Sequence, residues 1–149
     1  MSVTEEETAK IIIFGEGRVG KEEMLSKYFS QFNEGKKNAI NPSFYQITKE
    51  YGGKKVRLNF YDTAGSEQFN AINTMYYQNA AGALLIYNAD FFETFEKVKN
   101  WVHTLREAVG NEIILVIAGN NFDLCDKNIL SKNKEEVDAY CTQHNCQHF

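Results

Sequence analysis

Hydrophobic residues along the chain form short unbroken runs that are separated by stretches with helical spacing. The runs cover 11–14, 83–87 and 113–118, and each is bounded by Gly, Asn or Asp. Such runs are typical of strands buried on both faces, so we expect neighbours in a parallel sheet. Between the last two runs, hydrophobic residues recur three or four positions apart, at Phe91, Phe95, Val98, Val102 and Leu105. Alternating strands and helices predict an α/β domain.

Two further strands are expected at 44–51 and 55–61, on either side of Gly52 and Gly53. Adjacent glycines supply the positive φ that a tight hairpin requires, which predicts an antiparallel edge. The helix between the later runs is expected to begin at Asp90 as N-cap, with Glu93 completing a capping-box-like pair. Residues 33–43 hold the only proline and no periodicity, which predicts a loop.

Length and composition narrow the class of protein. A chain of 149 residues fits one domain, 1–149, and a net charge of -4 argues against nucleic-acid binding. The acidic start and the three cysteines favour a reduced, cytoplasmic location. No apolar run approaches the ~20 residues of a membrane span, so no membrane contact is expected from this chain. The cysteines are Cys125, Cys141 and Cys146.

A phosphate-binding pattern follows the first run. Gly15, Gly20 and Lys21 match G-x-x-x-x-G-K, between a predicted strand and a predicted helix. Glycines allow backbone N–H groups to face phosphate oxygens, Lys21 would reach the outer phosphates, and the helix N-terminus adds positive charge. An ordinary strand-to-helix turn is the alternative. Gly15, Gly17 and Gly20 also spell G-x-G-x-x-G, but the acidic ribose partner of a dinucleotide site is missing where it is expected.

Two downstream motifs decide between these interpretations. "DTAG" at 62–65 and "NNFD" at 120–123 each follow a predicted strand directly. Alone, either would be a turn more often than a site, because Asp, Asn and Gly favour turns. The order of strand, phosphate loop, D-x-x-G and N-x-x-D is specific, and it favours a nucleotide site.

With these motifs, the chain resembles the Ras superfamily of small GTPases, and within it the Rab family most, from about Lys10 to Phe149. The resemblance includes "RLNFYDTAGSEQF", "MYYQNAAGALLIYN", "FEKVKNWV" and "GNNFDL". It implies a Ras-like P-loop G domain, with a mostly parallel sheet, one antiparallel edge strand and helices on both faces. It also implies C-terminal truncation, with the Ser-Ala-Lys loop, last strand and final helix beyond Phe149.

The resemblance implies GDP or GTP as ligand, with Mg²⁺, and a role in vesicle trafficking or signalling. The full-length protein would then be peripheral to endomembranes. Effector, exchange or activating proteins would contact the switch regions and the positions of an aromatic triad, Phe44, Tyr61 and Tyr76. Core packing of these three aromatic residues is an equally open interpretation.

The same resemblance assigns the base site. Asp123 can accept two hydrogen bonds from guanine that adenine cannot supply, so guanine is favoured. Asn120 would brace the loop, and Phe32 would stack on the base or pack in its helix. The expected nucleotide-binding residues are Gly15, Glu16, Gly17, Arg18, Val19, Gly20, Lys21, Glu22, Glu23, Phe32, Asn120, Asn121, Asp123 and Leu124.

Several positions depart from the family pattern. Glu22 replaces the hydroxyl residue that holds Mg²⁺, Ala39 replaces the switch threonine, and Asn121 replaces the lysine beside the guanine. Metal binding is therefore expected to be weak and to involve Glu22 and Asp62. The expected catalytic residues are Ser66, Lys21 and Gly65. Because Ser66 stands where family members have the glutamine that orients the attacking water, hydrolysis should be slow.

Two alternatives remain open at this point. Glu22, Ala39 and Ser66 also suit a pseudo-GTPase, a scaffold or recognition module in which nucleotide is structural or absent. Arg18 could serve as an internal arginine finger or lie solvated in its loop. A zinc site is a further alternative, although the spacing matches no familiar finger and the resemblance puts its four residues at a helix end and the start of a strand. Its ligands would be Cys141, His144, Cys146 and His148.

Overall fold

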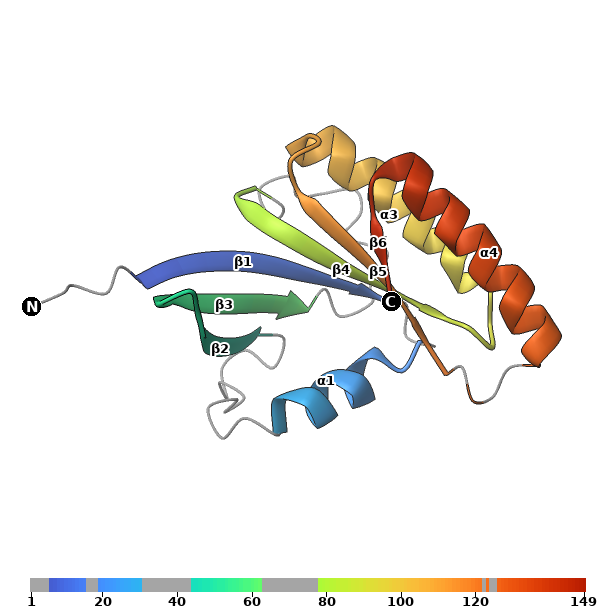
Figure 1. The fold of residues 1–149 in the computed structure, drawn as a ribbon, viewed down its shortest axis with the longest axis horizontal. Coiled ribbons are helices and arrows are strands. Elements are labelled where there is room, and N and C mark those ends of the chain that lie inside the picture. The colour runs from blue at the N-terminus through green and yellow to red at the C-terminus, as the bar shows by residue number, and fades with distance from the viewer. Residues whose placement is uncertain (1–5, 16–18, 31–43, 63–77, 122, 124–125) are drawn as a thin grey trace, which may run out of the picture.

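The computed structural model describes residues 6–15, 19–30, 44–62, 78–121, 123 and 126–149, with the backbone alone at 22 and 30. These residues form a six-stranded sheet and three helices (Figure 1). The elements are β1 (Glu6–Gly15), α1 (Lys21–Ser30), β2 (Phe44–Tyr51), β3 (Lys54–Asp62), β4 (Ala80–Asn88), α3 (Thr94–Val109), β5 (Ile114–Asn120), α4 (Lys127–His144) and β6 (Gln147–His148).

The strands follow the order β2-β3-β1-β4-β5-β6, and only β2 is antiparallel to its neighbour. The prediction of neighbouring parallel strands is confirmed, since β1, β4 and β5 adjoin in the sheet. Parallel strands end at one edge, and the register places Ile13 beside Asp62 and Asn88 beside Asn120. The phosphate loop, D-x-x-G and N-x-x-D therefore begin at the same edge of the sheet, as ligand sites in open α/β folds do.

The hairpin between β2 and β3 forms where the glycines predicted it. Gly52 and Gly53 have φ values of 55° and 81°, a region that suits residues without a Cβ. The antiparallel edge strand is thus confirmed. Its register pairs Phe44 with Tyr61 at the far end from the turn.

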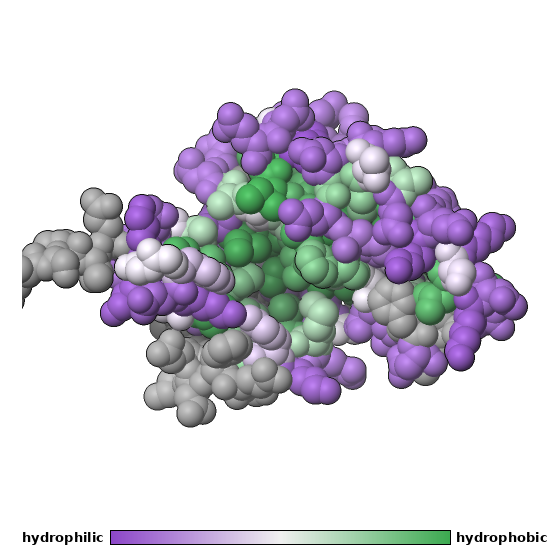
Figure 2. Space-filling model, in the orientation of Figure 1, coloured by the Kyte–Doolittle hydropathy of each residue, from purple (hydrophilic) through white to green (hydrophobic). Residues whose placement is uncertain are grey.

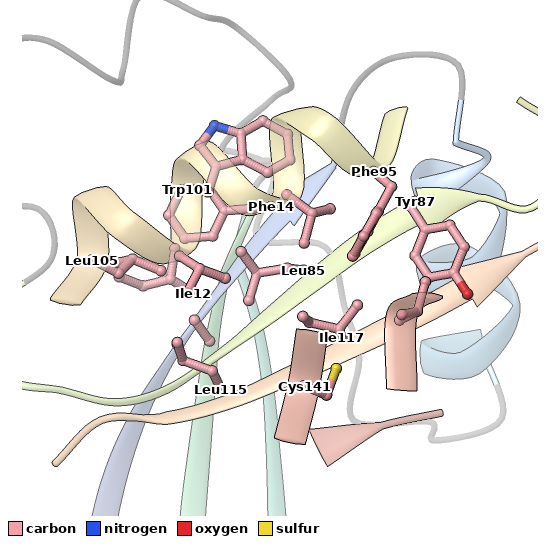
Figure 3. Close-up of a cluster of buried hydrophobic side chains, with 14 of the residues drawn as sticks. Ile12, Phe14, Leu85, Tyr87, Phe95, Trp101, Leu105, Leu115, Ile117 and Cys141 are labelled. Carbon is pink, nitrogen blue, oxygen red and sulfur yellow. The ribbon is translucent and has the colours of Figure 1, made fainter. Parts of the chain in front are cut away.

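One face of the sheet carries the larger core, beneath α3 and α4. Alternate residues of β1 point to opposite faces, so Ile12 and Phe14 enter this core while Ile13 does not. Phe95, Trp101 and Leu105 from α3 meet the strands here, and Cys141 enters from α4 (Figure 3). This amphipathic packing matches the hydrophobic stripe predicted for the α3 segment.

The opposite face packs against α1. Ile13 and Ile86 meet Leu25 and Phe29 of that helix, so helices cover both faces as predicted. Further along this face a hollow of about 390 Å³ is lined almost wholly by apolar residues, including Ile11 and Ile114. Figure 2 shows hydrophobic residues gathered across the middle of one face of the molecule. Among the described helices, none is both long and apolar enough to cross a membrane.

The start of α3 differs from the sequence prediction. The helix begins at Thr94, after Glu93, rather than following an Asp90 cap, and Glu93 makes no side-chain cap bond. Thr94 explains the delay, because its hydroxyl donates to the Phe91 carbonyl at 2.8 Å and accepts the Asn88 N–H at 2.8 Å. Residues 89–93 consequently lie between β4 and α3, and Phe91 stays outside the helix.

At the C-terminal end, the resemblance put a helix end and the start of a strand among the last residues and the last strand beyond Phe149, and the structure shows α4 ending at His144 with a short strand after it. Gln147 and His148 already pair with β5 as β6. This C-terminal end is held against the rest of the domain by two side chains, Arg106 and His148. Arg106 of α3 donates to the carbonyl oxygens of Asn111, Ile113, His144 and Asn145 at 2.9–3.4 Å. His148 contacts Tyr87 through Nε2 at 2.9 Å and Asp138 through Nδ1 at 2.6 Å.

Candidate nucleotide-binding site

Between β1 and α1, Gly15 and Gly20 leave room for neighbouring side chains that a Cβ would contact. Gly20 has a φ of 73°, and a Cβ added there would lie 2.7 Å from Nδ2 of Asn120. A Cβ on Gly15 would lie 2.9 Å from Cγ2 of Val19 and 3.1 Å from Cδ of Lys21. Both glycines of the predicted phosphate pattern are thus required by close approach, which supports the phosphate-loop interpretation over an ordinary turn.

Lys21 is the first residue of α1 and is almost completely buried. Its Nζ lies 2.6 Å from Oδ1 of Asp62 at the end of β3, with 4% and 9% of the two side chains exposed. The contact is an ion pair without hydrogen-bond geometry, and Nζ has no hydrogen-bond acceptor among the described residues. Buried ammonium groups ordinarily have their donors satisfied, so this lysine fits an acceptor that comes from a ligand.

Asn120 connects the N-x-x-D motif to the phosphate loop. Its Nδ2 donates to the carbonyl oxygen of Val19 at 2.7 Å, across 101 residues of sequence. Asn121 follows with a φ of 63°, a left-handed conformation that asparagine tolerates better than most residues. Asp123 is exposed at the same edge, so its carboxylate is accessible to a base. The structure therefore brings the phosphate and base motifs together.

The remaining predicted site residues divide into two groups. Glu23 is exposed on α1, and Val19 is buried beneath the loop. Only the backbone of Glu22, within α1, is described. The other predicted positions lie outside the described residues: Glu16, Gly17, Arg18, Phe32, Ala39, Gly65, Ser66, Tyr76 and Leu124.

Two members of the expected aromatic triad lie together. The ring centroids of Phe44 and Tyr61 are 5.1 Å apart, and Lys10 lies 5.3 Å from the centroid of Tyr61. Both aromatic residues are half-buried on the β2–β3 ribbon. Both are therefore partly accessible, which is compatible with core packing and with partner binding.

The residues of the zinc alternative do not converge. His148 uses both ring nitrogens on Tyr87 and Asp138, and the ring of His144 stacks on Tyr140 at 4.1 Å. Burial raises the pKa of the Cys141 thiol to about 12, with Cys146 and Asp138 adding to the rise. Within the described part of the chain, no three His, Cys, Asp or Glu side chains are placed to hold a metal. The zinc interpretation is set aside.

For a magnesium ion bound with nucleotide, the carboxylate of Asp62 at the end of β3 is a suitable ligand. A carboxylate oxygen is a hard ligand of the kind that Mg²⁺ prefers. Oδ1 is already 2.6 Å from the Lys21 ammonium, however. The carboxylate of Asp62 is thus chemically suited to Mg²⁺, but it already forms an ion pair with Lys21.

The sequence motifs predicted Lys21 and Asp62 as separate site residues and did not predict the contact between them. It depends on the register that places Asp62 beside Ile13 of β1. The available signal was positional, because one residue ends a strand and the other begins a helix at the same edge of the sheet.

Comparison with known proteins identifies the family. The Ras family model matches residues 10–149, and the chain belongs to the Ras family. It is 38% identical over 141 residues to Ras-related protein Rab-21 of Mus musculus, which covers 94% of this chain and 63% of the relative. It is also 38% identical over 141 residues to Ras-related protein Rab-21 of Homo sapiens, which covers 94% of this chain and 62% of the relative. GTP-binding protein YPT53 of Saccharomyces cerevisiae is 33% identical over 149 residues, covering 95% of this chain and 67% of that protein.

The chain thus spans 62–63% of the length of these two Rab-21 proteins. The family assignment agrees with the sheet order, the single antiparallel strand and the helices on both faces.

Proposed function

We propose that this chain binds guanine nucleotide and works as a Rab-like small GTPase with slow intrinsic hydrolysis. The observation that carries the proposal is the buried ammonium of Lys21, which has no hydrogen-bond acceptor among the described residues. It stands at the N-terminus of α1, where backbone N–H groups also lack helical partners. A phosphate group would satisfy both.

Base recognition is assigned to the other end of the site. Asp123 is exposed there, and its carboxylate suits the ring N–H and amino group of guanine. Asn120 couples this end to the phosphate loop through its 2.7 Å bond to Val19. The name of the relative YPT53 as a GTP-binding protein agrees with this assignment.

Calorimetric titration with GDP and ADP tests the nucleotide preference. The unmodified chain should bind GDP and should bind ADP far more weakly, whereas Asp123→Asn should lose much of that difference. Glu112→Gln is the matched control, because it removes the same charge from an exposed carboxylate that precedes β5, at the opposite end of the strands from the motif. Equal affinity of the unmodified chain for the two nucleotides would contradict the proposal.

Magnesium is proposed to bind weakly, through Asp62 and phosphate oxygens. When bound, the ion would supply positive charge that offsets the phosphates. Glu22 and Ala39 stand where hydroxyl ligands are expected from the family pattern. A chelator should therefore speed the release of bound GDP only modestly, and a large acceleration would show that Glu22 is a strong ligand.

Hydrolysis is proposed to be slow because the attacking water lacks a positioning residue. Ser66 is too short to replace glutamine, and Ala39 cannot close on the outer phosphate. Ser66→Gln alone should restore little, whereas its combination with Ala39→Thr and Glu22→Ser should restore more than the single changes predict. Single-turnover rates measure this. Fast hydrolysis by the unmodified chain, or full rescue by Ser66→Gln, would contradict it.

A role in vesicle trafficking is proposed from the similarity to Rab-21. The half-buried pair Phe44 and Tyr61 on the β2–β3 ribbon is the proposed contact for effector or exchange proteins. Peripheral association with endomembranes would belong to the full-length protein.

A second candidate function is a recognition module that works without nucleotide. The ion pair between Lys21 and Asp62 favours it, because the charge of the lysine is then balanced inside the protein. The same titration separates the two functions, since this module would bind neither GDP nor ADP.

A further inference from the structure

The ion pair between Lys21 and Asp62 joins two residues that the proposed function assigns to different ligands. Lys21 is needed by nucleotide phosphate, and Asp62 by a divalent cation. In the structure each contacts the other at 2.6 Å, with 4% and 9% of the side chains exposed. Charges that are buried together interact far more strongly than charges in water. A phosphate that binds Lys21 must therefore offset the loss of this contact.

We propose that Asp62 competes with nucleotide phosphate for Lys21, so that the metal-free affinity for GDP is lower than the phosphate loop alone would give. This inference rests on the proposed guanine-nucleotide site. Asp62 is then more than a metal ligand. It also supplies the negative charge that stabilises Lys21 when nucleotide is absent.

The geometry makes the two partners of Lys21 alternatives. The stem of the lysine runs beside Gly15, where even an added Cβ would lie 3.1 Å from Cδ. Asp62 is held by the β1–β3 ladder, in which it pairs with Ile13, so its backbone cannot follow a moving ammonium. A shift of Nζ away from the end of β3, towards a phosphate bound at the N-terminus of α1, would therefore lengthen the contact with Oδ1.

The exchange also has an energetic direction. Burying a lone charge is costly, which is why the nucleotide-free chain gains from the pair. With nucleotide present, the phosphates take over as the counter-charge of Lys21, and Asp62 is left as a second negative group beside them. A divalent cation held by Asp62 would supply a counter-charge to its carboxylate and would thereby weaken its hold on Lys21. Removing the charge of Asp62 should therefore strengthen GDP binding in the absence of metal.

Asp62→Asn tests this, because asparagine has nearly the same shape and lacks the charge. GDP affinity is measured by calorimetry in excess EDTA for the unmodified chain, Asp62→Asn and the control Glu112→Gln, which removes an exposed carboxylate at the opposite end of the strands. Asp62→Asn should bind GDP on the order of tenfold more tightly, and the control should match the unmodified chain. A residue that acted only as a metal ligand would leave metal-free affinity unchanged. One that only maintained the fold would weaken binding, so either result would overturn the inference.

Stability supplies a second readout. Without nucleotide, Asp62→Asn should melt at a lower temperature than the unmodified chain, and GDP should raise its melting temperature by more. If the variant does not fold alone, refolding in GDP should rescue it, because the phosphates replace the missing counter-charge. Failure to fold in GDP as well would contradict the inference.

The nucleotide site and the competition for Lys21 can be tested separately. If the unmodified chain binds GDP and ADP equally, the proposed function is wrong. If it binds GDP selectively and Asp62→Asn binds GDP no more tightly in EDTA, the competition is wrong while the nucleotide site stands.

Discussion

Two polar clusters in this protein differ in how their hydrogen-bonding groups are satisfied. The Lys21 cluster, made of Lys21 and Asp62, leaves the ammonium without a hydrogen-bond acceptor among the described residues. The His148 cluster, made of Tyr87, Asp138 and His148, is closed by contacts of 2.9 Å and 2.6 Å. Both include the end of a strand and a residue that is distant in sequence. The first has a buried donor left for a ligand, whereas both ring nitrogens of His148 in the second are already used.

This difference in hydrogen bonding distinguishes a ligand-binding site from a cluster that stabilises the fold. A satisfied network stabilises one arrangement, here the attachment of β6 to the sheet and to α4. An ion pair with unused donors can exchange one partner for another. Variants in the Lys21 cluster should therefore have effects that depend on GDP, whereas variants in the His148 cluster should have effects that do not.

The largest expected effect is that of Lys21→Ala. The variant leaves the carboxylate of Asp62 buried without its cation, which should lower the free energy of unfolding by about 3–5 kcal/mol. GDP affinity should fall at least about a hundredfold, since the phosphates lose their cation. Chemical denaturation and calorimetry measure the two effects. Lys132→Ala, on the exposed surface of α4, is the control and should change neither. Retained GDP affinity in Lys21→Ala would show that the Lys21 cluster does not bind the phosphates.

A smaller effect is expected from Gly20→Ala. The positive φ of 73° and the 2.7 Å approach of the new Cβ to Asn120 should together cost about 2–3 kcal/mol of stability. Gly52→Ala is a matched control, because Gly52 has a φ of 55° with nothing within 4 Å of an added Cβ. It should cost about 1 kcal/mol. Only Gly20→Ala should also weaken GDP binding. Equal costs in thermal unfolding would show that the contact with Asn120 is unimportant.

Tyr87→Phe tests the His148 cluster. Loss of the hydroxyl removes the 2.9 Å hydrogen bond to His148 and should lower stability by about 1 kcal/mol. GDP affinity should stay within about twofold of that of the unmodified chain, well under 1 kcal/mol. A stability loss that disappears in saturating GDP would mean that this cluster is coupled to the nucleotide site, against the distinction drawn above.

The smallest effect concerns Cys141, which packs beside the His148 cluster. Burial raises its pKa to about 12 from an ordinary value of 9.0, so the folded protein holds the thiol proton after the unfolded chain has lost it. Stability should be complete below pH 9 and should fall as pH rises above it. At pH 9, iodoacetamide should modify Cys141 only after unfolding, as measured by mass spectrometry of its peptide. Rapid modification of the native protein would contradict this burial.

Sequence patterns predicted the elements that are specified locally. Unbroken hydrophobic runs located β1, β4 and β5, and the pair of glycines located the β2–β3 turn. Patterns missed the polar start of β1, where Glu6 pairs with Arg57 at 2.7 Å. They also placed the start of α3 too early, because the turns held by Thr94 depend on a contact with the end of β4.

The site was predictable as a set of motifs and not as a set of contacts. Lys21, Asp62 and Asn120 each follow or precede a predicted element, so their common edge could be foreseen. The bond between Asn120 and Val19 crosses 101 residues, and the bond between Tyr87 and His148 crosses 61. Contacts of this kind depend on strand register and side-chain packing, which no local pattern encodes.

The most direct test of the central claim is to identify the nucleotide that copurifies with the chain. Protein purified without added nucleotide is denatured, and the released small molecules are separated by ion-exchange chromatography and quantified against protein. The claim predicts GDP, with or without GTP, and no matching amount of adenine nucleotide. Release of ADP or ATP in place of guanine nucleotide, or protein that releases none and fails to take up added GDP, would contradict it.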